Sequence, residues 1–287
     1  MLLIIAKILY KLNQIKKRFQ KNKSHINDSL TELHFTIIIT SYNNKKYCEK
    51  NLESVLKQHY KNYNVIYIDD FSTDNTETLV KNYLDKYDKN NICSYIRNKK
   101  RSLKLKNLYK TIHNLPDNEI IIELDGDDYF AHSKVLKIIN TCYQETNAIF
   151  IHTCYYNNPK NLAKKMKLET FSHKTPWIIK KYGLFRKYPW IYSGIRTYYA
   201  WLFKKIKKEN LICKTEPYAN QFFPVSHDLA VTYPLLEMTS SKISYISDPL
   251  LIRNVDSNIN DFKKYDDRIR VVINKDITSQ KRYDKIC

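Results

Sequence analysis

The chain is poor in glycine, and this scarcity excludes two large classes of nucleotide-binding protein. Three glycines occur in 287 residues, Gly126, Gly183 and Gly194. A dinucleotide-binding turn of the form G-x-G-x-x-G and a phosphate-binding loop of the form G-x-x-x-x-G-K-[ST] both need glycines that lie closer together. The sequence therefore excludes a Rossmann NAD fingerprint and a P-loop NTPase.

Paired cysteines and long apolar runs are lacking as well. The six cysteines are far apart, without the C-x-x-C spacing of zinc or redox sites. The apolar stretch Met1 to Leu12 is shorter than the ~20 residues of a membrane-spanning helix, and its charge follows the apolar part, the wrong order for a secretory signal. We therefore expect a cytoplasmic location, where thiols stay reduced.

Acidic residues are few: 29 Asp and Glu stand against 49 Lys and Arg, a formal net charge of +20. The excess lies in residues 1–24 and 155–214. Charge confined to two segments suits an anionic membrane surface, a phosphorylated substrate or a merely solvated surface. Residues 1–30 are predicted to be a basic amphipathic arm, with residues 1–24 either packed on the protein, disordered or in contact with the cytoplasmic side of a membrane. No nucleic acid is expected as a partner.

From residue 35 to residue 152, apolar runs typical of strands alternate with helical periodicity. This alternation predicts an α/β, Rossmann-like fold with a mostly parallel open sheet flanked by helices, in which ligands bind beyond the carboxyl ends of the strands. Asp74 and Glu77 are predicted to form a reciprocal cap at the start of one helix. Strands are expected over 35–41, 65–68, 92–96, 120–124 and 148–152, and helices over 47–58, 103–115 and 133–143.

Beyond residue 157 the alternation stops, because prolines interrupt a basic, aromatic-rich stretch. We predict helices over 196–208 and 228–238 and a strand over 243–246. No low-complexity linker divides the chain, so residues 158–287 are expected to cover the ligand edge of the same domain.

An acidic turn follows the strand that is predicted to end at Leu124. Asp125, Asp127 and Asp128 place three carboxylates within four residues, and Gly126 lets the backbone turn without a Cβ. Like charges so close repel each other, and a divalent cation would reverse that cost. Mn²⁺ or Mg²⁺ held by these carboxylates and by substrate phosphate oxygens is one explanation, and a solvated turn is the other.

Two further motifs follow other strands, and together the three resemble family 2 glycosyltransferases of GT-A fold. Thr40-Ser-Tyr-Asn43 follows the first strand, Asp69-Asp70-Phe-Ser-Thr-Asp74 the second, and Ile122-Glu-Leu-Asp-Gly-Asp-Asp-Tyr129 contains the acidic turn. The resemblance covers residues 35–260 approximately. It implies a nucleotide-sugar-binding half over residues 31–157 and an acceptor-side half with the catalytic base over residues 158–287.

The resemblance also implies roles for individual residues. A bound nucleotide sugar would contact Thr40, Tyr42, Asn43, Asp69, Asp70, Arg101, Asp125 and Gly126, with Asp70 favoured over Asp69 for the base; the metal would lie on Asp125, Asp127 and Asp128. Asp228, in Ser226-His-Asp228, would be the catalytic base. From the residues alone, Arg101 also suits a surface loop and Asp228 a helix N-cap. Arg196 suits either a contact with phosphate or acceptor or a place on a helix face.

The implied activity is a metal-dependent, inverting transfer of a sugar from a nucleoside diphosphate donor, with UDP-sugars favoured, to a hydroxyl of a glycan, protein or lipid. Two residues depart from the family pattern: Phe71 replaces a small residue, and His227 stands where Glu is frequent. Two other hypotheses stay open. The acidic turn also suits a metal-dependent nucleotidyl or phosphoryl transferase, and the net charge suits a non-catalytic protein that binds nucleic acid or membrane.

Overall fold

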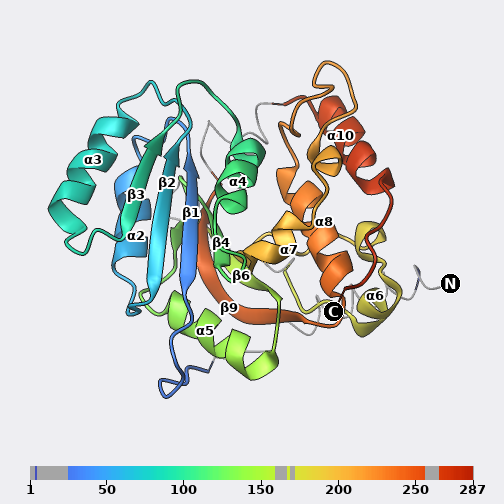
Figure 1. The fold of residues 1–287 in the computed structure, drawn as a ribbon, viewed down its shortest axis with the longest axis horizontal. Coiled ribbons are helices and arrows are strands. Elements are labelled where there is room, and N and C mark those ends of the chain that lie inside the picture. The colour runs from blue at the N-terminus through green and yellow to red at the C-terminus, as the bar shows by residue number, and fades with distance from the viewer. Residues whose placement is uncertain (1–3, 5–24, 159–166, 169–171, 256–264, 287) are drawn as a thin grey trace.

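A mixed sheet forms the centre of the protein, whose computed structural model describes residues 4, 25–158, 167–168, 172–255 and 265–286. Most of the predicted N-terminal arm, residues 1–3 and 5–24, lies outside the described residues. Within them, the sheet has nine strands in the order β3-β2-β1-β4-β8-β6-β9-β5, with β7 paired to β6 (Figure 1). The strands are β1 (Phe35–Ser41), β2 (Tyr63–Asp69), β3 (Cys93–Arg97), β4 (Ile120–Asp125), β5 (Tyr129–Phe130), β6 (Phe150–Asn158), β7 (Lys167–Leu168), β8 (Arg196–Tyr199) and β9 (Ile243–Asn254).

The first half of the sheet confirms the predicted alternation of strands and helices. Strands β3, β2, β1 and β4 are parallel neighbours, and their register aligns Ser41 with Asp69 and Thr40 with Asp125. All three motifs therefore begin at the same edge of the sheet. The connecting helices are α2 (Cys48–Leu56), α3 (Thr76–Tyr87), α4 (Lys104–His113) and α5 (Val135–Thr146).

The second half departs from the prediction at residues 196–208. Residues Arg196 to Tyr199 form strand β8, which pairs antiparallel with β4 on one side and with β6 on the other. The predicted helix is therefore wrong over Arg196–Tyr199 and right over Ala200–Lys204, which form α7. Thr197, Tyr198 and Tyr199 are aromatic or β-branched residues, which favour strands, and they complete the sheet. The remaining helical elements are α6 (Trp177–Tyr182), η1 (Phe185–Lys187), α7 (Ala200–Lys204), η2 (Lys208–Leu211), α8 (His227–Thr239) and α10 (Asp267–Ser279).

Two apolar layers cover the sheet, one on each face. Ile38 and Ile121 pack in the layer that contains α4, α7 and α8, whereas Ile37, Ile39 and Ile122 pack in the layer that contains α2 and α5. Successive residues of β1 thus point to opposite faces, as expected for a strand that is buried on both sides. No helix among the described residues has the length and apolar character needed to span a membrane.

The predicted reciprocal cap of α3 is wrong. The Asp74 carboxylate accepts hydrogen bonds from the backbone N–H of Thr76 at 3.1 Å and of Lys45 at 3.0 Å. Glu77 instead forms ion pairs with Lys81 and Arg97. Asp74 therefore links the turn after β1 to the start of α3. The turn after β1 and the turn after β2 both bear predicted nucleotide-binding residues.

A buried ion pair fixes the C-terminal helices to the rest of the fold. Arg186 donates from Nε to Glu237 Oε1 at 2.6 Å and from Nη2 to Oε2 at 2.9 Å, and it also donates to the carbonyl of Ile277. The backbone N–H of Tyr283 donates to the same carboxylate. This pair connects η1, α8 and the segment that ends α10.

We expect Arg186→Met to lower the free energy of unfolding by about 3–5 kcal/mol, because it leaves the Glu237 carboxylate buried without its charged partner. Urea unfolding at pH 7 measures the change. Lys187→Met, which removes the neighbouring exposed cation, is the matched control and should change the value by less than about 0.5 kcal/mol. Equal stabilities of the two variants would contradict this role of the ion pair.

Candidate active site

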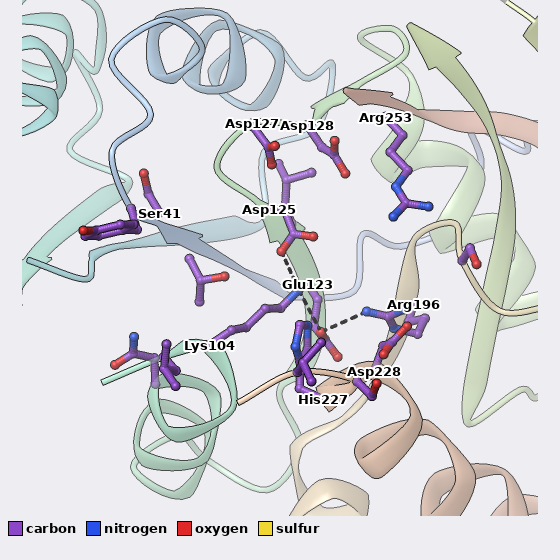
Figure 2. Close-up of a pocket in the computed structure, with 18 of the residues that line it drawn as sticks. Ser41, Lys104, Glu123, Asp125, Asp127, Asp128, Arg196, His227, Asp228 and Arg253 are labelled. Atoms are coloured by element: carbon purple, nitrogen blue, oxygen red, sulfur yellow. Dashed lines mark hydrogen bonds and ion pairs between the residues drawn. The ribbon is translucent and has the colours of Figure 1, made fainter. Parts of the chain in front are cut away.

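A cavity of about 450 Å³ lies beyond the carboxyl ends of β1, β2 and β4 (Figure 2). The N-terminus of α4, strand β8, the N-terminus of α8 and the end of β9 complete its wall. It therefore lies where open α/β sheets bind their ligands. The predicted site residues that line it are Thr40, Tyr42, Asp70, Arg101, Asp125, Asp127, Asp128 and Asp228.

Asp70 shapes one end of the cavity. Its Oδ1 accepts from Asn98 Nδ2 at 2.6 Å and from the N–H of Ser102 at 2.8 Å, and its Oδ2 accepts from the N–H of Leu103 at 2.8 Å. Beside it, the Arg101 guanidinium lies over the Tyr42 ring, 3.5 Å from its centroid. Arg101 is therefore part of the cavity wall and not only a charge on a surface loop.

The remaining predicted residues of these turns, Asn43 and Asp69, lie outside the cavity lining. Asp69 accepts hydrogen bonds from the N–H of Ser72 and from Tyr95 Oη, both at 2.9 Å. The Asn43 N–H donates to Ser72 Oγ at 2.9 Å. Asn43 therefore links the turn after β1 to the turn after β2, and Asp69 links the second of these turns to β3. Phe71 adopts a φ of 68° in this region, a conformation that few bulky residues tolerate.

The acidic turn packs closely against the end of β1. A Cβ added to Gly126 would lie 2.6 Å from Asn44 Nδ2 and 2.8 Å from Ser41 Oγ, so only glycine fits. The side chain of Asn51, in α2, donates to the carbonyls of Asp125 at 3.0 Å and Asp128 at 2.7 Å. The side-chain amide of Asn51 thus fixes the backbone of the turn. The carboxylates of the turn lie on the cavity side (Figure 2).

Four charged side chains form a chain across the cavity floor (Figure 2). Lys104 Nζ lies 2.5 Å from Asp125 Oδ1 and 3.6 Å from Glu123 Oε2. Glu123 also accepts from Arg196 Nη2 at 3.3 Å and from Tyr198 Oη at 2.8 Å. Acids and bases alternate along this chain. Each of the three buried side chains, Lys104, Glu123 and Arg196, therefore has an oppositely charged neighbour, the condition under which burial of charge is tolerated.

The two ends of the acidic turn have opposite pKa shifts. Desolvation raises the pKa of Asp125, but nearby positive charge, chiefly that of Lys104, which also donates a hydrogen bond, outweighs it and lowers this pKa to about 2. Burial raises the pKa of Asp128 well above its usual range, and Asp127 and Asp125 raise it further. Negative charge at Asp128 is therefore only partly compensated by its hydrogen bond from the N–H of Asn254.

This charge distribution fits a divalent cation that is bound jointly with a ligand. Among the described residues, no group of three or more His, Cys, Asp or Glu side chains is arranged to hold a metal by itself. Mg²⁺ and Mn²⁺ commonly use one or two carboxylates and complete their coordination with water and substrate phosphates. The hard oxygen donors of Asp127 and Asp128, with excess negative charge, meet that description.

The N-terminus of α8 forms the opposite wall. Ser226, with a φ of 57°, is the N-cap residue, so Asp228 is not the N-cap and its side chain lines the cavity. Arg196 and His227 lie nearby (Figure 2). Burial lowers the pKa of His227, and the Lys104 charge lowers it further, so its imidazole is neutral at pH 7.

Sequence reasoning missed three charged residues of the cavity, Lys104, Glu123 and Arg253. A signal exists only for Glu123, a lone acid within the apolar run Ile120 to Leu124, which is predicted to be buried on both faces. Lys104 is one of many lysines in a helix, and Arg253 lies in a strand that was predicted to end at residue 246. Arg196 lines the cavity from a strand and not from a helix face.

Comparisons with known proteins agree with this fold. Residues 36–210 match the family model described as Glycosyl transferase family 2. The structure is similar to Staphylococcus aureus TarS 1–349 in complex with UDP-GlcNAc (TM-score 0.59, 17% identity, 82% of this chain and 62% of that one). It also resembles the mannosyltransferase PcManGT from Pyrobaculum calidifontis in complex with GDP-Man and Mn²⁺ (TM-score 0.60, 15% identity, 98% and 76%). These likenesses confirm the predicted GT-A fold.

Curated relatives match part of the chain at the sequence level. An uncharacterized glycosyltransferase of Mycoplasma genitalium is 32% identical over 128 residues, 44% of this chain and 42% of that protein. The Escherichia coli UDP-Glc:alpha-D-GlcNAc-diphosphoundecaprenol beta-1,3-glucosyltransferase WfaP is 33% identical over 125 residues, 42% of this chain and 45% of that protein. The chain thus spans less than half the length of the curated relatives it matches.

We expect Asp128→Asn to stabilise the metal-free protein at pH 7 by about 1 kcal/mol, a gain typical of replacing a strained functional charge. The pKa of Asp128 is raised in the folded state. Its contribution to the free energy of unfolding therefore falls as the pH rises above about 4, the pKa of an aspartate in the unfolded chain. The amide oxygen of Asn still accepts from Asn254. Urea unfolding in EDTA should therefore show a difference at pH 7 that disappears near pH 3.5.

The exposed Asp85→Asn is the control for Asp128→Asn and should leave stability unchanged at both pH values. If Asp128→Asn instead lowers the free energy of unfolding at pH 7, the negative charge of Asp128 is not unfavourable in the folded protein.

Proposed function

The chain belongs to glycosyl transferase family 2, and from this premise we propose that it transfers a sugar from a nucleoside diphosphate donor to an acceptor hydroxyl, with a divalent cation and with inversion at the anomeric carbon. The observation that carries the proposal is the shared cavity: Asp228 faces it from α8, the acidic turn from β4 and Asp70 from β2. A base, a metal site and a nucleotide pocket would then surround one reacting centre.

The donor nucleotide would lie between Tyr42, Asp70 and Arg101, beside Thr40. A carboxylate has about four lone-pair positions, and three donors already contact Asp70. One position remains, which suits the single imide N–H of uracil, so we favour a UDP-sugar. Arg101 would reach the diphosphate as a charged donor. Asn43 and Asp69 would act by shaping the turns after β1 and β2. Gly126 would act by allowing the acidic turn to lie close to the end of β1.

The cation would lie on Asp127 with Asp128 or Asp125. When bound, it supplies charge that stabilises the departing nucleoside diphosphate. The complex of the Pyrobaculum mannosyltransferase with Mn²⁺ supports this choice of ion, and Mg²⁺ has the same preference for oxygen ligands. The protein would hold these carboxylates in place at the end of β4, where Asn51 and Gly126 fix the turn.

Asp228 would remove the proton of the acceptor hydroxyl as its oxygen attacks the anomeric carbon from the face opposite the diphosphate. General-base assistance of this kind contributes about 10²–10⁴ to the rate. His227 is neutral and lies beside it, so it adds no positive charge that would weaken the base. Arg196 lies close enough to Asp228 for their charges to interact.

Residues of the second half would contact the acceptor. Trp190, Ser193 and Asn274 line the cavity from this half and offer an aromatic face and polar groups for a hydroxylated molecule. The relative WfaP is named for a diphosphoundecaprenol acceptor, which supports a lipid-linked glycan among the glycan, protein and lipid acceptors. Membrane contact by residues 1–24 on the cytoplasmic side stays a prediction outside the described residues.

The function is tested with a panel of nucleotide sugars incubated with and without Mn²⁺. We expect slow hydrolysis of one UDP-sugar that depends on Mn²⁺ and releases UDP, and we expect Asp127→Ala to abolish it. Release of pyrophosphate would instead indicate nucleotidyl transfer. Turnover by Asp127→Ala at the wild-type rate would remove the metal from the proposal.

Asp228→Asn should retain donor binding and reduce transfer by about 10²–10⁴, because an amide cannot accept the hydroxyl proton. Calorimetry with UDP and Mn²⁺ measures binding, and a coupled assay of UDP release with the identified acceptor measures transfer. Asp85→Asn again provides an exposed control. Transfer by Asp228→Asn within about threefold of wild type would exclude Asp228 as the base.

A further inference from the structure

Lys104 places a buried positive charge directly beside the acidic turn. Its side chain is 9% exposed, and its ammonium lies 2.5 Å from Asp125 Oδ1. An ammonium group withdrawn from water is costly unless an opposite charge compensates it. The position is also unfavourable for the helix, because Lys104 is the first residue of α4, where the helix dipole repels a cation.

The backbone before Lys104 is held in a strained form that aims it at the cavity. Leu103 has φ 66° and ψ 159°, a combination that residues other than glycine rarely adopt. The Asp70 carboxylate maintains it by accepting the N–H groups of Ser102 and Leu103, both at 2.8 Å. Asp70 thus joins the predicted nucleotide pocket to the lysine through two hydrogen bonds.

Glu123 does not by itself explain why the positive charge of Lys104 is buried at this position. It is already paired with Arg196 at 3.3 Å and with Tyr198 Oη at 2.8 Å, whereas Lys104 is 3.6 Å away. The shorter contact of Lys104 is with Asp125, at the start of the acidic turn. The lysine therefore neutralises the carboxylate that a cation on this turn would also use or approach.

We propose that Lys104 is a built-in counter-ion of Asp125 that makes the divalent cation and the nucleoside diphosphate bind cooperatively. Without nucleotide, Lys104 competes with the cation for the negative charge of the turn, so the cation binds weakly. A diphosphate brings further negative charge, and both positive charges can then remain in the cavity. This inference rests on the proposed function, since it takes the cavity to be the donor site.

Calorimetry at fixed ionic strength tests the coupling with two probes, Mn²⁺ and UDP. Each is titrated alone and in the presence of the other. For the wild type we expect UDP to strengthen Mn²⁺ binding, and Mn²⁺ to strengthen UDP binding by the same factor, as linkage requires. For Lys104→Met we expect Mn²⁺ alone to bind about tenfold more tightly, with a correspondingly smaller coupling factor.

Three further variants make the result specific. Lys104→Arg keeps the charge and should keep the coupling. Lys104→Gln removes the charge but keeps a hydrogen-bond donor, and it should behave like Lys104→Met, which provides a second neutral variant if the methionine protein does not fold. Lys110→Met removes an exposed lysine from the same helix and should match the wild type.

The outcomes separate this inference from the proposed function. If the wild type binds Mn²⁺ and UDP cooperatively and the neutral variants do so with the same factor, the role of Lys104 is refuted while the donor site stands. If the wild type binds neither probe in any combination, the proposed function fails and the inference fails with it. Loss of coupling in Lys110→Met as well would assign the effect to net charge and overturn the inference.

Discussion

The crowding of carboxylates at one edge of a parallel sheet is the constraint on which the site depends. Parallel strands in register bring their carboxyl ends together, so the residues after β1, β2 and β4 share one small volume. Asp70 and Asp125 lie at that edge, and the acidic turn adds Asp127 and Asp128. The protein compensates with hydrogen-bond donors for Asp70 and buried cations for Glu123 and Asp125. Within the acidic turn the crowding persists, because the charges of Asp127 and Asp125 raise the pKa of Asp128.

The parallel half of the fold and its edge could be predicted because their signals are local. The run Phe35 to Ser41 is apolar throughout, the next strand ends in two aspartates, and the acidic turn contains the glycine that its contact with Ser41 requires. Each of these features is determined by neighbours in the chain. Their spatial proximity then follows from the rule that parallel strands align their carboxyl ends.

The rest of the site could not be predicted, because it depends on contacts between distant parts of the chain. Arg196 becomes a strand residue only because β4 and β6 leave a gap that β8 fills. Lys104 differs from the other lysines of its helix through its ion pairs with Glu123 and Asp125, which are distant in the chain. Asp228 lies on the cavity because Ser226 adopts a positive φ and becomes the N-cap in its place.

The charge of the cavity is opposite to that of the chain. Six acidic and four basic side chains line it, a formal charge of −2 within a protein of net charge +20. Under the proposed function, the basic chain would attract an anionic donor from a distance, since long-range fields accelerate association. The negative charge of the cavity would then favour a diphosphate that enters together with a cation over a free diphosphate. The placement of charge would thus contribute to the selection of a metal-bound donor, independently of any contact with the sugar.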